Sequence, residues 1–420
     1  MSSDVKVGAL PPASAAPAVK LDKFKLGVLS LGHLVGDMYY ATLIPLWPLL
    51  IDRMSLSLTD VGLFTSLTSF MLMPVQPFIG WLVDRFPRAW FMILGLIGAA
   101  LGMSFIGLAP TYSLLMVCVV FGRFSNAIFH PHAAMMVRAT SGGRHGTAMS
   151  IFAFAGNIGI AVGPLLSVGV VTLFGLESTY LMIPLGLIAA AAIYYFIGVD
   201  VPKESSPSAS KQEGGSGLAS AAQTFVGPLL LLAVLMTFRA AIWGGFRTFL
   251  PIFLVDSRAV TLVVGGLGLS ALSLFGALGG LLGGHLSDRY SGSWVIALSL
   301  LISAATIVAF VKTDGILSLL MLIVAGMSLF ASQPVATVLA QELAPDRMAM
   351  ASGVMMGMVW GIGALFVTPI GMLGDVFGLN ASMYALAVLA ALTGLGSFFL
   401  PEFRQRYGSR LREIFQSPST

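Results

Sequence analysis

Long apolar runs fill most of the chain, and short segments rich in Gly, Pro or charged residues separate them. Twelve runs are long enough to be helices that span a bilayer, which takes about 20 apolar residues. They cover residues 24–50, 59–83, 90–109, 112–138, 146–173, 178–199, 224–254, 261–286, 293–311, 315–342, 348–374 and 380–400. The pattern predicts an all-α integral membrane protein with twelve transmembrane helices. A re-entrant segment, such as 293–311, is the alternative for one of the shorter runs.

A polar segment divides the twelve runs into two sets of six. Residues 200–223 contain many Ser, Gly, Lys and Glu residues, which is typical of a flexible linker. We therefore predict a first six-helix half at residues 24–199 and a second at residues 224–400, with tails at residues 1–23 and 401–420.

Composition narrows the class of protein further. Of the 420 residues, 57% are hydrophobic and 10% are charged, whereas an ordinary soluble domain has roughly 25% charged residues. A soluble fold is therefore excluded. The single cysteine, Cys118, excludes an internal disulfide and a cysteine metal cluster. The sequence contains no Walker phosphate loop, no paired catalytic carboxylates and no Ser/His/Asp set, so it indicates neither ATP-driven transport nor an enzyme.

The basic residues predict the orientation in the membrane. Of the 22 Lys and Arg residues, 16 fall in the tails and in the loops on one side of the predicted bilayer, three on the other side and three inside helices. Because cytoplasmic loops carry the excess of Lys and Arg, both termini and the linker are expected in the cytoplasm. The formal net charge of +4 is then explained by the Lys and Arg residues of the cytoplasmic loops and tails, and no nucleic-acid partner is expected.

Two motifs recur at nearly the same interval. Gly80-Trp81-Leu82-Val83-Asp84-Arg85-Phe86, at the end of the second predicted helix, is echoed 204 positions later by Gly284-His285-Leu286-Ser287-Asp288-Arg289-Tyr290 at the end of the eighth. His130-Pro131 on the fourth helix is echoed 203 positions later by Gln333-Pro334 on the tenth. The repeat indicates duplicated halves, and such parallel repeats place a substrate site between them near the middle of the bilayer.

These motifs resemble those of a known family. The run Gly80-x-Leu82-x-Asp84-Arg85-x-x-Arg88 is similar to the signature loop of the major facilitator superfamily, although Pro87 stands where the family usually has Gly. The resemblance implies two six-helix halves around a central cavity, a monomer, and secondary transport of a small molecule by alternating access. It also implies gating by these loops and by a motif of the fifth helix, with the residues Gly80, Asp84, Arg85, Arg88, Asp288, Arg289, Gly159, Gly163 and Pro164.

A narrower resemblance lies between residues 129 and 166. Phe129-His130-Pro131, Ser141-Gly142-Gly143-Arg144-His145-Gly146 and Gly156-Asn157-x-Gly159 are similar to segments of the fosmidomycin resistance protein subfamily of drug exporters. The glycines of the fifth helix, followed by Pro164, also resemble the antiporter motif of the superfamily. The resemblance implies an antiporter for drug efflux in a bacterial inner membrane. Close helix packing alone would also explain small residues at this spacing.

Four ionisable residues lie well inside predicted helices. They are Asp37, Arg123, Arg239 and Arg247, so three arginines against one aspartate leave the interior with a formal charge of +2. A central Asp or Arg costs roughly 2.5–3.5 kcal/mol on insertion scales, so each is expected to have a partner or a function. His33 precedes Asp37 by four residues on the same helical face, which predicts a proton-coupling pair. A structural pair between Asp37 and an arginine is the alternative.

A polar stripe on the fourth predicted helix is the first candidate for substrate binding. Arg123, Asn126 and His130 share one face of this helix. His132 lies about 200° round the helix from His130, so these two imidazoles cannot chelate one metal ion. We expect no metal site and no cofactor. Further polar contacts with the substrate are expected from Gln76, Asn157 and Gln333.

A second stripe lies on the seventh predicted helix, where Arg239, Trp243 and Arg247 follow one another at intervals of four residues. Two guanidinium groups beside an indole suit an anionic or amphiphilic ligand, which they bind by paired hydrogen bonds and stacking. In the alternative, Arg247 extends to the membrane surface and Arg239 only neutralises Asp37.

Together these features favour a secondary transporter. The leading hypothesis is a proton-coupled exporter, or antiporter, of a small drug-like or anionic organic compound, with Asp37 and His33 carrying the proton. A proton-linked importer of small organic anions is the alternative within transporters, and a non-transporting membrane receptor or enzyme is the alternative outside them. The expected partners are the substrate, protons and the lipid bilayer.

Overall fold

The computed structural model describes residues 21–75, 78–79, 90–198, 218–344 and 348–400, and all regular secondary structure within these ranges is helical. In the first half the helices are α1 (Lys23–Tyr40), η1 (Ile44–Leu46), α2 (Trp47–Met54), α3 (Leu58–Leu72), α5 (Trp90–Ser104), η2 (Ile106–Leu108), α6 (Tyr112–Thr140), α7 (His145–Phe174), η3 (Leu176–Met182) and α8 (Ile183–Phe196). In the second half they are α9 (Leu218–Ile252), η5 (Phe253–Ser257), α10 (Leu262–Arg289), α11 (Gly292–Lys312), α12 (Gly315–Leu343), α13 (Met348–Gly353), η7 (Val354–Met358), α14 (Val359–Leu365), α15 (Val367–Phe377), α16 (Leu379–Gly396) and η8 (Ser397–Phe399).

The predicted all-α membrane fold with twelve spans is confirmed. Eleven helical stretches of the described residues are long and apolar enough to cross a bilayer, and α3 supplies a shorter apolar helix. The run predicted at 293–311 forms α11, a continuous apolar helix of 21 residues. This length matches a span, so the re-entrant alternative is not needed.

Two of the helices that the apolar pattern predicted as continuous are interrupted. The first predicted helix ends at Tyr40 and resumes at Trp47, after Pro45 and with Pro48 in its first turn, because a proline cannot donate the backbone hydrogen bond that continues a helix. The eleventh is divided by a π-helical turn and by a break at Phe366, shortly before Pro369. The apolar pattern predicts which segments lie in the membrane, but it does not predict where a helix is interrupted within such a segment.

One predicted boundary also differs. The helix expected to begin at residue 224 begins at Leu218, inside the segment predicted as a linker. The helix therefore extends beyond its apolar stretch, which hydropathy alone cannot detect.

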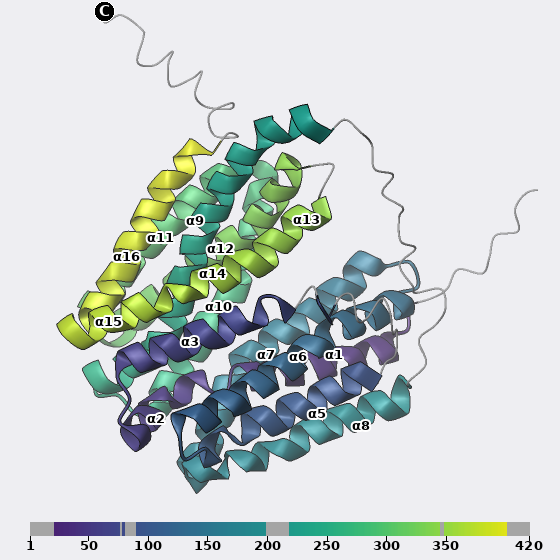
Figure 1. Cartoon of the computed structure of the whole chain (residues 1–420), viewed down its shortest axis with the longest axis vertical. Helices are drawn as coiled ribbons and strands as arrows, with labels where there is room; N and C mark the ends of the chain where they lie inside the picture. Colours follow the sequence, from purple (N-terminus) through teal and green to yellow (C-terminus); the bar gives the residue numbers. More distant parts are fainter. Residues whose placement is uncertain (1–20, 76–77, 80–89, 199–217, 345–347, 401–420) are drawn as a thin grey trace, which may run out of the picture.

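The helices of the two halves form two bundles, which Figure 1 shows in purple to teal and in green to yellow. The bundles meet where α3 packs against α14 and α15 and where α7 packs against α10. Small residues permit this approach. A Cβ atom on Gly62 would lie 2.7 Å from the Val367 carbonyl oxygen, and one on Gly371 would lie 2.3 Å from the Leu58 carbonyl oxygen.

Hydrogen bonds also join the halves along α3. The carboxylate of Asp375 accepts hydrogen bonds from the backbone N–H groups of Leu58 and Thr59, each at 2.8 Å, and from the Thr59 hydroxyl. Further along, the Ser66 hydroxyl donates to the Ala364 carbonyl oxygen at 2.7 Å. These contacts lie toward the end of the bundle that the Lys and Arg count predicts to be periplasmic.

Candidate transport site

A carboxylate between two imidazoles lies in the first half, where α1 meets α6. Nε2 of His33 lies 3.2 Å from Oδ2 of Asp37, and Nε2 of His130 lies 3.1 Å from Oδ1. The Asn126 side-chain amide donates to the same Oδ1 at 3.2 Å. Asp37 is 9% exposed, so water does little to solvate this carboxylate. We call His33, Asp37 and His130 the acid–imidazole cluster.

Each imidazole of the cluster is held by a second contact on its other nitrogen. Nδ1 of His33 lies 2.7 Å from the Phe152 carbonyl oxygen on α7, and the ring stacks on the Phe152 ring at 4.0 Å between centroids. Nδ1 of His130 lies 2.8 Å from the Asn126 carbonyl oxygen. Both rings are thus oriented so that Nε2 faces Asp37.

A glycine of α7 makes room for the cluster. A Cβ atom on Gly156 would lie 2.5 Å from two atoms of the His33 ring and 2.7 Å from Oδ2 of Asp37. Any side chain at this position would displace the carboxylate or the imidazole. Gly159 and Gly163 serve the same packing, since Cβ atoms there would lie 2.1 Å and 2.3 Å from carbonyl oxygens of α1.

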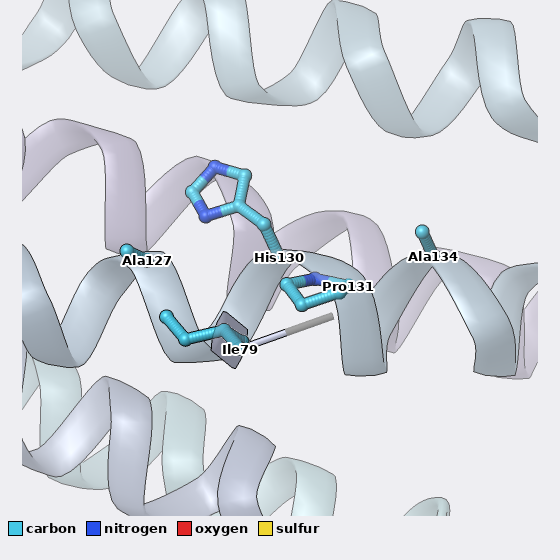
Figure 2. Close-up of a pocket in the computed structure, with 5 residues that line it drawn as sticks. All are labelled: Ile79, Ala127, His130, Pro131 and Ala134. Carbon is cyan, nitrogen blue, oxygen red and sulfur yellow. The ribbon is translucent and has the colours of Figure 1, made fainter. Parts of the chain in front are cut away.

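The cluster reaches a cavity through His130. The cavity has a volume of about 260 Å³ and is lined by Ile79, Ala127, His130, Pro131 and Ala134 (Figure 2). The His130 side chain is 37% exposed, against 9% for His33 and 12% for Asp37. His130 is therefore the most exposed member of the cluster.

Three guanidinium groups are buried without an acidic partner among the described residues. Arg239 is 0% exposed and Arg123 and Arg247 are each 7% exposed. Within the described part of the chain, no hydrogen-bond partner is found for Nε of Arg123, for one terminal nitrogen of Arg239, or for Nε and one terminal nitrogen of Arg247. Buried donors without partners are costly, so these atoms are poised to receive an acceptor.

Aromatic rings surround the arginines of α9. The guanidinium carbon of Arg239 lies 5.1 Å from the Phe330 ring centroid and 5.2 Å from that of Trp360. The Trp243 ring centroid lies 5.9 Å from the guanidinium carbon of Arg239 and 5.8 Å from that of Arg247. The three side chains of the predicted stripe are therefore in contact. The alternatives for this stripe are wrong. Arg247 is buried rather than extended to the surface, and the ion-pair partners of Asp37 in the described chain are histidines.

The two halves contain equivalent contacts with different chemistry. In the second half Arg239 donates to the side-chain oxygen of Gln333 at 2.8 Å and to the Leu329 carbonyl oxygen at 3.1 Å. Gln333 lies 203 positions after His130, and Arg239 lies 202 positions after Asp37. An aspartate–histidine contact that can change its proton content thus corresponds to an arginine–glutamine contact of fixed charge.

Other predicted residues lie apart from this site or outside the described chain. The side-chain amide of Asn157 donates to the Ala153 carbonyl oxygen of its own helix. His132 stacks on Phe91 and does not join His130, as its position on the helix predicts. Asp288 and Arg289 are exposed at the end of α10. The remaining predicted site residues lie outside the described residues, namely Gln76, Gly80, Asp84, Arg85 and Arg88.

The acid–imidazole cluster also brings three possible metal ligands close together, although the sequence predicted no metal site. The ligand atoms of His33, Asp37 and His130 all lie within 4.8 Å of one another, a set that the sequence did not single out because His130 lies on another helix. Each pair of facing atoms is already within hydrogen-bond distance, so a proton is sufficient to bridge it. The absence of a metal site remains a prediction.

Comparisons with protein families and with known proteins identify similar membrane transport proteins. The family model described as Major Facilitator Superfamily matches residues 29–368. The chain is 29% identical over 390 residues to a Bacillus subtilis (strain 168) protein named uncharacterized MFS-type transporter YfnC, covering 89% of this chain and 92% of that protein. It is 25% identical over 394 residues to the fosmidomycin resistance protein of Escherichia coli (strain K12), covering 91% of this chain and 93% of that protein.

Solved structures show the same fold. A bacterial homologue of the human lysosomal transporter Spinster, in an inward-facing and unoccupied conformation, superposes with a TM-score of 0.77 at 19% identity, covering 91% of this chain and 97% of that one. The nucleoside transporter NupG superposes with a TM-score of 0.72 at 15% identity, covering 90% of this chain and 98% of that one. At these identities the similarity concerns the fold alone.

Proposed function

Because the chain belongs to the major facilitator superfamily, we propose that it is a proton-coupled exporter of a small drug-like or anionic organic compound. Membership makes it a multi-pass secondary transporter of a small molecule and not an enzyme. Proton coupling, the substrate class and the direction of transport are our proposals. They are supported by the geometry of the site and by similarity to the fosmidomycin resistance protein.

The acid–imidazole cluster is the observation that carries the proposal. Asp37 is buried between two imidazoles, and one of them borders a cavity. Imidazole is the side chain whose unperturbed form changes charge near neutral pH, which makes it a suitable group for taking up and releasing protons. An ionisable residue buried within a membrane span is a candidate for a substrate, ion or proton pathway, and the ion-pair partners of Asp37 in the described chain are histidines rather than arginines.

The arginines support an anionic or amphiphilic substrate. The free N–H groups of Arg123, Arg239 and Arg247 can bind a carboxylate or phosphonate, and Trp243 and Trp360 can pack against its apolar part. An anion bound there would satisfy donors that otherwise remain without partners. The polar contact through Gln333 positions Arg239 for this role.

Alternating access would proceed by rocking of the two halves within a monomer in the lipid bilayer. The contacts between Asp375 and the start of α3 close one end of the molecule. We propose that a second set of gating residues lies at the predicted cytoplasmic end, comprising Asp288 and Arg289 together with the loop residues Gly80, Asp84, Arg85 and Arg88. These residues would contact one another when the cytoplasmic end closes and the periplasmic end opens. The close packing of Gly159 and Gly163 against α1, and of Pro164 beside Gly266 of α10, transmits the motion.

The test is Asp37→Asn, which keeps the shape of the side chain and removes its ability to titrate. In proteoliposomes with an imposed pH gradient, the variant should lose uphill movement of fosmidomycin while insertion and expression stay normal. Asp314→Asn is the matched control, because Asp314 is a mostly exposed partner of Arg258 far from the cluster. Uphill transport by Asp37→Asn with normal proton flux would place coupling elsewhere.

The proton-linked importer is a second candidate, and one observation favours it. Arg247 lies within electrostatic range of Asp37 and Arg123, so a bound anion and an unprotonated Asp37 would compete for the same positive groups. Protons and an anion should then bind together and move in the same direction. Flux measured in vesicles of known orientation separates the candidates: proton entry with the anion supports the importer, and opposite movements support the exporter.

A further inference from the structure

From the hydrogen bonds around Asp37 we infer that the acid–imidazole cluster holds two protons in its loaded state, one in each contact between an imidazole and the carboxylate. The inference deepens the proposed proton coupling, because it gives the number of protons that the site can carry. It depends on which atoms in the cluster are able to donate.

The outer nitrogen of each ring must carry a hydrogen. Nδ1 of His33 faces the Phe152 carbonyl oxygen at 2.7 Å, and Nδ1 of His130 faces the Asn126 carbonyl oxygen at 2.8 Å. A carbonyl oxygen can only accept, so Nδ1 is the donor in both contacts. In a neutral imidazole with Nδ1 protonated, Nε2 is an acceptor without a hydrogen.

Both Nε2 atoms face oxygens of one carboxyl group. His33 approaches Oδ2 at 3.2 Å and His130 approaches Oδ1 at 3.1 Å. An unprotonated Nε2 and an ionised carboxylate oxygen are both acceptors, so they repel each other at this distance. Each contact becomes a hydrogen bond only when it contains a proton, on either the nitrogen or the oxygen. Two such contacts therefore require two protons.

The charge of the cluster follows from this count. With neutral imidazoles and an ionised Asp37 the formal charge is −1, and the two protons bring it to +1. The second proton is held more weakly than the first, because it adds a positive charge to a neutral cluster in a poorly solvated site. We expect it to leave through His130, whose side chain is the most exposed of the three.

The surroundings make the loaded state responsive to a ligand. Around the cluster, Asn126 of α6 donates to Asp37 and Gly156 of α7 lies against His33 and Asp37. Arg247 of α9 lies within electrostatic range of Asp37, and Arg123 of α6 lies within range of Arg247. Arg247 opposes the second proton. An anion bound to Arg247 would cancel this repulsion and so favour full loading, which gives the two sites a physical connection.

Nuclear magnetic resonance of the full chain in lipid nanodiscs tests the inference without a substrate. The sequence has five histidines, so ring-labelled ¹⁵N spectra recorded across a pH titration can be assigned with single His→Gln variants. Neutral His33 and His130 should both carry their hydrogen on Nδ1. Infrared spectra of the Asp37 carboxyl group complete the count, which should reach two protons per chain.

Variants give the count a second readout. His130→Gln and His33→Gln should each lower it from two protons to one, and the control His132→Gln should leave it at two. An Nε2–H tautomer of neutral His33 or His130 in the wild-type chain would overturn the inference, as would a wild-type count of one. If the wild-type cluster binds two protons but Asp37→Asn still couples transport to protons normally, the proposed function would be contradicted. The inference that the cluster binds two protons would then still hold.

Discussion

The carboxylate of Asp375 binds both the backbone N–H and the hydroxyl of Thr59, and the two residues belong to different halves of the transporter. Asp375 thereby caps the first turn of α3, where a negative charge is also favoured by the helix dipole. We propose that this contact exists only while this end of the molecule is closed, so that it acts as a latch on one state of the transport cycle.

We predict that Asp375→Asn shifts the chain toward the state in which this end is open. The amide keeps the shape but loses the charge, and a loss of about 1.4 kcal/mol corresponds to a tenfold shift in the ratio of the two states. Pulsed electron paramagnetic resonance between spin labels at Asp52 and Val376, in a Cys118-free background, should show a larger population at long distance. Glu177→Gln is the control, because its partner Arg53 lies in the same half. Unchanged distances in Asp375→Asn would mean that the latch is not needed.

Gly156→Ala should strongly impair proton coupling although it removes no titratable group. The added Cβ would lie 2.5 Å from the His33 ring, so the cluster must move apart. We expect at least a tenfold loss of proton-driven transport. Gly169→Ala on the same helix is the control, since no neighbouring atom lies within 4 Å of its Cβ position, and alanine favours a helix by up to about 1 kcal/mol. Equal activity of the two variants would contradict the packing argument.

Arg239→Lys and Arg247→Lys should weaken the binding of an anion and leave the binding of a neutral analogue nearly unchanged. Lysine keeps the charge but loses the planar set of donors that matches a carboxylate or phosphonate. We expect about a tenfold rise in Kd for fosmidomycin and little change for a neutral diester of it, measured by calorimetry. Equal losses for both ligands would reduce these arginines to a structural role.

The orientation in the membrane can be tested by labelling. Cysteines at Ser208 and Ser419, in a Cys118-free background, should react with a membrane-impermeant reagent only after the cytoplasmic side is opened, because the Lys and Arg count places the linker and the C-terminus there. Reaction of either cysteine in intact cells after permeabilisation of the outer membrane would reverse the assignment.

The sequence by itself determined those features that depend on one helix at a time. Apolar length predicted the spans, and the spacing of four residues predicted that His33 and Asp37 face each other and that Arg239, Trp243 and Arg247 form one stripe. Such relationships follow from the geometry of the α-helix, whichever way the helix is turned in the bundle.

Tertiary structure decided which helices meet and which faces they present. His130 was predicted to contact substrate, yet it lies against Asp37, which is 93 positions earlier in the chain. The latch between Asp375 and Thr59 and the space left by Gly156 were likewise not predicted. The physical reason is that the lipid-facing and protein-facing surfaces of these helices are both apolar, so hydropathy does not fix their rotation. Rotation and partners are set instead by the close packing of small residues and by the few polar contacts between helices.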